Sequence, residues 1–196
     1  MTSEQRINFI VKWIKGYCNT IKNQPISLVV GVSGGIDSAV TSTLAAKTNL
    51  KTFAISMPIK QNQNQYDLSL RHLKWLEGNY KNVETKIIDL NQVFDSFNLT
   101  MKEFSNDLAF ANSRARLRMT TLYQIAQSKR GLVVGTGNKV EDFGVGFFTK
   151  YGDGGVDISP IADCTKTEVW EMGKTLSIID EIIEAKPTDG LWADNR

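Results

Sequence analysis

The feature that most constrains the fold is an apolar segment that leads directly into a glycine-rich turn and then into a helical pattern. Residues 26–32 (ISLVVGV) are almost continuously apolar, which is typical of a parallel strand covered on both faces. The turn Ser33-Gly34-Gly35 follows, and residues 37–47 are rich in alanine, valine and leucine. A strand, a tight turn and a helix in this order begin a βαβ unit, so the sequence predicts a parallel sheet.

The rest of the chain continues the alternation. Further strand-like runs occupy residues 51–57, 83–90 and 131–135. Helical patterns cover residues 4–22, 64–78, 91–98, 108–129, 165–176 and 178–185, and a glycine-rich loop is expected over 136–156. We therefore predict one α/β domain over residues 1–196, a doubly wound, mostly parallel sheet with helices on both faces. Ligands of such sheets bind beyond the carboxyl ends of the strands, which would bring residues 31–38 and 135–138 together.

Composition narrows the possible functions. The chain has 23 Lys and Arg against 21 Asp and Glu, and this balance argues against nucleic-acid and anionic-membrane partners. No apolar run approaches about 18 residues, and the first residues do not resemble a signal peptide, so a cytoplasmic location without membrane association is expected. Two cysteines and one histidine leave catalysis to carboxylates, lysine, arginine, hydroxyls and backbone amides. That histidine, His72, is expected to be a surface or packing residue.

The segment 31–38 (GVSGGIDS) carries the sharpest chemical signal. Its glycines allow the backbone to approach an anion closely, and the amides and dipole of the following helix favour phosphate or pyrophosphate. The segment lacks the lysine of a GxxxxGK[ST] loop and the spacing of a GxGxxG loop. Asp37 beside an anion implies a bridging cation. The alternative is an ordinary glycine-rich turn with Asp37 as a helix-start carboxylate.

A second group of candidate residues lies between positions 136 and 166. Thr136 follows a strand and could contact a base or ribose, and Glu141 could share Mg²⁺ with Asp37. Lys150 and Lys166 are candidate cations for a carboxylate or phosphate. The glycines and aromatics between them predict a mobile cover, with a plain surface loop as the alternative.

Four motifs together resemble a known family. SGGIDS is similar to the pyrophosphate loop of the ATP pyrophosphatases, whose sheet is of the adenine nucleotide α-hydrolase type. With GTGNKVE, FFTKYGDGGVD and ARLRM (115–119), the chain resembles bacterial NAD synthetases over nearly its whole length. The resemblance implies a C–N ligase that adenylates deamido-NAD with ATP and amidates it with free ammonia, releasing AMP and pyrophosphate. A lid carboxylate, Asp153 or Asp157, could take a proton from ammonium.

The resemblance also implies a set of site residues. ATP would contact Gly31, Val32, Ser33, Gly34, Gly35, Ile36, Asp37, Ser38, Thr136, Lys166 and Thr188. Mg²⁺ would bind Asp37 and Glu141, and deamido-NAD would bind Arg116, Lys150 and Asp157. Asp37, Glu141 and Lys166 would be the catalytic residues. The family continues past position 196 with a segment that includes a His-Lys pair, so this chain is expected to lack that part of the dinucleotide site.

A homodimer with the dinucleotide at its interface is implied as well. The helix 108–129 has an apolar stripe at Leu108, Ala111, Ala115, Met119, Leu122 and Ala126. Phe110 and Leu117 fall almost opposite, which favours a second buried face at a subunit interface, against the alternative of two isolated exposed residues. Two other functions stay open: another adenylating enzyme with a different acceptor, and a non-catalytic adenine-nucleotide-binding module.

Overall fold

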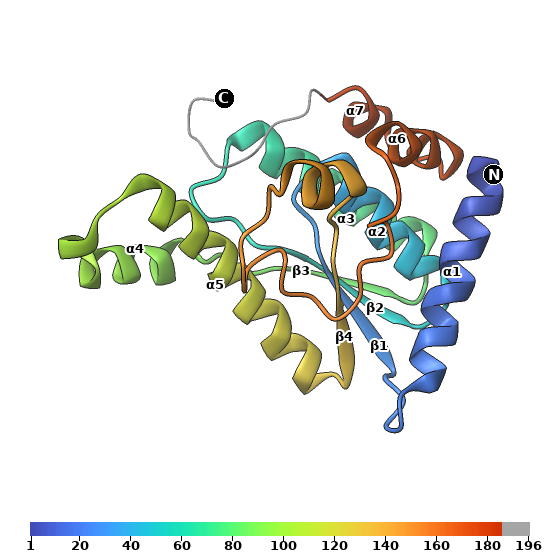
Figure 1. The fold of residues 1–196 in the computed structure, drawn as a ribbon, viewed down its shortest axis with the longest axis horizontal. Helices are drawn as coiled ribbons and strands as arrows, with labels where there is room; N and C mark the ends of the chain where they lie inside the picture. The colour runs from blue at the N-terminus through green and yellow to red at the C-terminus, as the bar shows by residue number, and fades with distance from the viewer. Residues whose placement is uncertain (186–196) are drawn as a thin grey trace.

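A computed structural model describes residues 1–185, built around a four-stranded, all-parallel sheet (Figure 1). The strands are β1 (Ser27–Gly31), β2 (Lys51–Ser56), β3 (Val83–Ile87) and β4 (Gly131–Val134), in the order β3-β2-β1-β4. Val30 of β1 pairs with Ala54 on one side and with Val134 on the other. The chain moves outward from β1 to β3 and then crosses back to β4, so the order reverses between β1 and β4. The predicted doubly wound parallel sheet is confirmed.

Both faces of the sheet are covered by helices. One face carries α1 (Ser3–Thr20), α2 (Ile36–Lys47), α3 (Gln63–Asn79), α6 (Lys166–Thr175) and the short α7 (Asp180–Ile183). The other carries α4 (Asn91–Thr100) and α5 (Asp107–Ser128). Leu28 and Val30 pack in the core with α1, α2 and α6, whereas Val29 between them packs against α5. This strict alternation on a fully apolar strand explains why residues 26–32 show no polar face.

The structure corrects three sequence expectations. The segment 136–156 is not wholly a loop, because residues Lys139–Val145 form a short π-helix, η2. The last predicted helix, 178–185, shortens to the four residues of α7. The prediction that Phe110 and Leu117 form a second apolar face of helix α5, away from the core, is wrong. Leu108 is 52% exposed, whereas Phe110 and Leu117 pack against the same core as Met119 and Leu122.

The reason for this last correction lies in α4 and the 3₁₀ turn η1 (Lys102–Phe104) that follows it. This segment folds back along α5, and the Phe94 ring meets the Phe110 ring edge to face at 6.2 Å. Phe110 is therefore covered within the subunit. His72 is fully buried between α2 and α3, as a packing residue. Within residues 1–185, no helix has the length and apolarity that crossing a membrane requires.

Candidate active site

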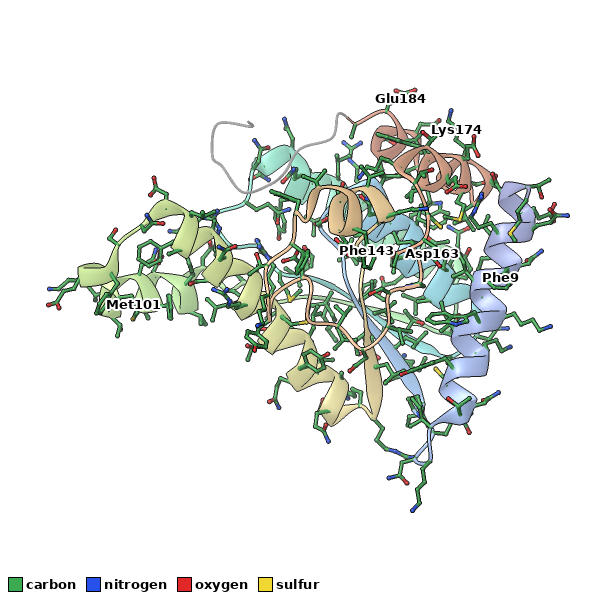
Figure 2. All side chains as sticks on the ribbon, in the orientation of Figure 1. Phe9, Met101, Phe143, Asp163, Lys174 and Glu184 are labelled. Atoms are coloured by element: carbon green, nitrogen blue, oxygen red, sulfur yellow. The ribbon has the colours of Figure 1, made fainter. Side chains whose placement is uncertain are left out.

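The candidate site lies beyond the carboxyl ends of β1 and β4, where the strand order reverses. The chain leaves β1 through the turn that begins α2, and it leaves β4 toward η2, whose Phe143 is labelled in Figure 2. A capping box between Thr165 and Glu168 begins α6 next to them, and Arg6 of α1 pairs with Glu168. Residues that are far apart in the sequence are thus brought to one edge, as predicted.

The turn after β1 is fixed by its own side chains. Ser38 Oγ accepts from the Ser33 N–H at 3.2 Å and donates to the Gly35 carbonyl at 2.9 Å. Gln61 Nε2 donates to the Ser33 carbonyl at 2.8 Å. The N-cap residue of α2, Gly35, makes no side-chain capping bond, so the first N–H groups of α2 keep donor capacity for an anion.

The two glycines of the turn have different roles. Gly34 has a φ of +96°, and a Cβ there would overlap the Gln65 carbonyl oxygen and lie 3.1 Å from the Ser69 nitrogen. Gly34 is therefore required by the close approach of α3. A Cβ on Gly35 would meet nothing nearer than Ser33 Oγ at 3.6 Å, so this glycine keeps the outer side of the turn open.

Two carboxylates and one lysine meet beside this turn. Lys166 Nζ lies 2.5 Å from Asp37 Oδ2 and 2.9 Å from Glu141 Oε1. Burial raises the pKa of Asp37, although the Lys166 ammonium opposes the shift. Burial alone would lower the pKa of Lys166, but the charges and hydrogen bonds of Asp37 and Glu141 outweigh it and raise that pKa. The three residues expected to be catalytic are therefore in direct contact.

This arrangement fits a divalent cation bound together with phosphate. Asp37 and Glu141 converge on one cationic atom, the Lys166 nitrogen. Among residues 1–185, no three His, Cys, Asp or Glu side chains group into a metal-binding cluster. Mg²⁺ commonly takes one or two carboxylates and completes its shell with phosphate and water. Asp37 and Glu141 match this number of carboxylates, so the pair fits Mg²⁺ brought in with a nucleotide.

Two residues near this cluster were missed by the sequence analysis. Asn138 is fully buried, donates to Asp37 and caps η2. Its spacing of three from Glu141 is that of a helix-start signal, which could have indicated the cap. Asp142 has its pKa raised to about 6 by burial and by the charges of Asp153, Glu141 and Asp37. Nothing in the local sequence distinguishes that carboxylate from its neighbours.

The residues expected to bind the dinucleotide fall into two places. Arg116 is exposed, and its Nε donates to the Lys150 carbonyl at 3.0 Å. The Lys150 ammonium lies over the Tyr151 ring, 5.2 Å from its centroid. Asp157 instead lies along β4, where it accepts from the Tyr123 hydroxyl at 3.1 Å and from the Val133 N–H at 2.8 Å.

Two of the expected ATP ligands and the other two arginines of α5 lie elsewhere. Thr136 is partly exposed just after β4, and Thr188 lies outside the described residues. Arg118 Nε donates to the Met57 carbonyl at 3.0 Å, and burial lowers its pKa to about 10. The Arg114 guanidinium lies 5.7 Å from the Phe94 ring centroid. Arg116 differs from both, because its guanidinium is exposed and donates to the Lys150 carbonyl.

Comparison with known proteins decides the family. A sequence model described as NAD synthase matches residues 6–196. The chain belongs to the NAD synthase family. The NH3-dependent NAD+ synthetase of Carboxydothermus hydrogenoformans is 37% identical over 195 residues, which cover 96% of this chain and 76% of that protein.

Solved structures of related proteins have the same fold as this member of the NAD synthase family. NMN synthetase from Francisella tularensis superposes with a TM-score of 0.90 at 34% identity, over 98% of this chain and 78% of that one. The NH3-dependent NAD synthetase from Campylobacter jejuni gives 0.83 at 31% identity, over 94% and 77%. The all-parallel sheet flanked by helices is thus the fold of NAD synthetases.

Proposed function

We propose that this C–N ligase of the NAD synthase family converts deamido-NAD to NAD with ATP and free ammonia. The observation that carries the proposal is the convergence of Asp37, Glu141 and Lys166 beside the open N-terminus of α2. An ATP triphosphate requires groups of these kinds: two carboxylates for a cation, one ammonium and a row of amide donors.

The first step is adenylation. A carboxylate oxygen of the nicotinate ring attacks the α-phosphorus of ATP, the bond to the β-phosphate oxygen breaks, and pyrophosphate leaves. Mg²⁺ held by Asp37 and Glu141 would offset negative charge on the phosphates. Lys166 then turns from the carboxylates to a phosphate oxygen, while the amides of residues 36–38, the first of α2, bind the departing group. One well-aimed donor of this kind contributes about 10²–10³ in rate.

The second step is amidation. Ammonia attacks the carbonyl carbon of the mixed anhydride, the bond to the AMP oxygen breaks, and the added nitrogen loses one proton to solvent to give the amide and AMP. Ammonium must first lose a proton, and a carboxylate with a pKa near neutrality is suited to take it. Asp142, with its pKa near 6, joins Asp153 and Asp157 as a candidate. Asp157 is the weakest of the three, because both its oxygens already accept hydrogen bonds.

The acceptor would be held by Arg116, Lys150 and Asp157. Arg116 and Lys150 are linked by a hydrogen bond and exposed to solvent, so both can meet a carboxylate or phosphate. Asp157 retains lone pairs for a ribose hydroxyl. These assignments belong to the same proposal. It also includes ATP contacts of Thr136 and Thr188, and a cytoplasmic location, where ATP is supplied.

A homodimer is also part of this proposal. Large apolar side chains are exposed along α4, η1 and the start of α5: Val93, Leu99, Phe104 and Leu108. Figure 1 shows that this arm extends away from the sheet. Exposed apolar residues gathered on one projecting arm are typical of a protein interface.

A second candidate acceptor is nicotinic acid mononucleotide. Its support is the TM-score of 0.90 to a protein described as an NMN synthetase. The two acceptors share the reacting carboxylate and differ by the adenylate half of the dinucleotide.

The deciding experiment supplies the chain with ATP, Mg²⁺, ammonium and one acceptor at a time, and identifies the products by mass spectrometry. We expect NAD from deamido-NAD at a higher kcat/KM than NMN from the mononucleotide. The opposite preference would support the second candidate. Tight ATP binding without pyrophosphate release with either acceptor would instead indicate a nucleotide-binding module.

A further inference from the structure

A buried asparagine connects the two carboxylates of the candidate Mg²⁺ site. Asn138 Nδ2 donates to Asp37 Oδ1 at 3.0 Å. Asn138 Oδ1 accepts from the N–H of Val140 at 3.0 Å and from that of Glu141 at 3.1 Å. One fully buried amide therefore contacts a side chain of α2 and the backbone of η2, which carries Glu141.

The chemistry of these partners fixes the orientation of the amide. A carboxylate only accepts and a backbone N–H only donates, so a flipped amide would face like groups on both sides. In the observed orientation, Asn138 occupies Asp37 Oδ1 and leaves Oδ2 facing the Lys166 ammonium. Glu141 meets the same ammonium from η2. The amide thus sets both the direction of one carboxylate and the position of the other.

We propose that Asn138 is a positioning residue that holds Asp37 and Glu141 in the geometry that one Mg²⁺ requires. The inference rests on the proposed function, because it takes these two carboxylates as the Mg²⁺ ligands. Asn138 acts through them and does not contact the reacting atoms. Groups that orient metal ligands typically change metal affinity roughly 10–100-fold when they are removed.

The substitution Asn138→Ser separates this role from helix capping. A serine hydroxyl still caps a helix start, but it is too short to reach Asp37. The matched control is Asn106→Ser, because Asn106 caps α5 through the Ala109 N–H at 3.0 Å and takes no part in the site. If Asn138→Ser does not fold, Asn138→Thr, which fills more of the space, is measured in its place.

Two readouts test the proposal. The first is the dissociation constant of Mn²⁺, a paramagnetic substitute for Mg²⁺, in the presence of α,β-methylene ATP, which cannot be cleaved between the α and β phosphates. The second is the Mg²⁺ dependence of turnover with deamido-NAD. We expect Asn138→Ser to raise the Mn²⁺ dissociation constant and the half-saturating Mg²⁺ concentration about tenfold or more. Saturating Mg²⁺ should restore most of kcat, and Asn106→Ser should match the unsubstituted protein.

Two results would overturn the inference. One is an unchanged Mn²⁺ affinity in Asn138→Ser. The other is a loss of kcat that saturating Mg²⁺ does not restore, because that result indicates a structural role only. If the unsubstituted protein bound no Mn²⁺ with the nucleotide, the proposed Mg²⁺ site itself would fail, which is a distinguishable result.

Discussion

At the scale of single residues, the site depends on three charged side chains that share a small, partly buried space: Asp37, Glu141 and Lys166. Lys166 offsets part of the negative charge of Asp37 and Glu141, and its ammonium lies beside Asp37 in the first turn of α2, where the proposed phosphate site begins. The same lysine can therefore stabilise the free protein and the ATP complex in turn. His72 of α3, which contacts Ser42 of α2, is a buried titratable group whose effect is on stability rather than on chemistry.

The first prediction concerns Lys166. Lys166→Ala should lower kcat/KM for ATP by about 10²–10³, because it removes a donor to the phosphates. Initial rates of pyrophosphate release measure the change. Lys174→Ala, an exposed lysine on the same helix, is the control and should leave the rate unchanged. Equal losses in both variants would show that Lys166 has no special role.

The second prediction concerns His72. Burial lowers its pKa to about 4 from an ordinary 6.5, so the folded protein holds the neutral ring. The unfolded chain binds a proton that the folded chain excludes, and stability therefore falls as pH drops from 6.5 toward 4. The loss should reach up to about 3 kcal/mol. Urea unfolding between pH 7 and pH 5 should show a steeper decline for the unsubstituted protein than for His72→Gln. Parallel declines would contradict a neutral His72.

At the scale of elements, the turn between β1 and α2 contains two adjacent glycines that are needed for different reasons. Gly34 lies where α3 passes closest to the turn, and Gly35 lies on the open side. The sequence shows both as glycine and cannot distinguish them, because the neighbour that excludes a side chain at Gly34 is about thirty positions further along the chain.

The third prediction follows from this difference. Gly34→Ala should destabilise the fold by more than about 1 kcal/mol, since alanine is strained at its positive φ and has no space. Gly35→Ala should keep the stability, because Gly35 has an extended backbone with a φ of −88°, but it should weaken ATP binding. Thermal unfolding and calorimetric ATP titration separate the two effects. If Gly35→Ala destabilised the fold while Gly34→Ala weakened only ATP binding, the roles assigned to the two glycines would be wrong.

The elements that the sequence predicted well are those with a strong local pattern. A nearly continuous apolar run indicated β1, and helical spacing placed α1, α3 and α5 within a few residues. The failures depend on distant contacts. Phe110 could be assigned to the core only once α4 was known to fold back on α5. Asn138 contacts Asp37 across 101 positions, so its role could not be read from local spacing.

At the scale of the whole molecule, large apolar side chains are exposed on three surfaces, and one of them is the arm formed by α4, η1 and the start of α5. Leu99 and Phe104 are each 73% exposed there. The second surface is α1, on the far side of the sheet, which exposes Phe9, Trp13 and Tyr17. The third is the segment 140–151, so apolar exposure alone does not identify an interface. The projecting shape of the arm distinguishes it from the other two surfaces (Figure 1).

The fourth prediction tests the arm as the dimer surface. Leu99→Glu and Phe104→Glu should shift the protein from dimer to monomer in sedimentation equilibrium, because each places a charge in an apolar contact. Phe9→Glu is the control and should leave the dimer intact. A dimer that tolerates both arm substitutions, or an unsubstituted monomer, would refute this assignment.

The central claim is that the residues between β1, η2 and α6 couple ATP cleavage to NAD formation. It is tested most directly by measuring NAD, AMP and pyrophosphate together, in the unsubstituted protein and in Asp37→Asn, with deamido-NAD, ammonia and Mg²⁺. We expect equal amounts of all three products from the unsubstituted protein. We expect Asp37→Asn, although folded, to form them far more slowly, because the Mg²⁺–ATP complex loses a ligand charge. Release of ADP and phosphate instead, or full product formation by Asp37→Asn, would contradict it.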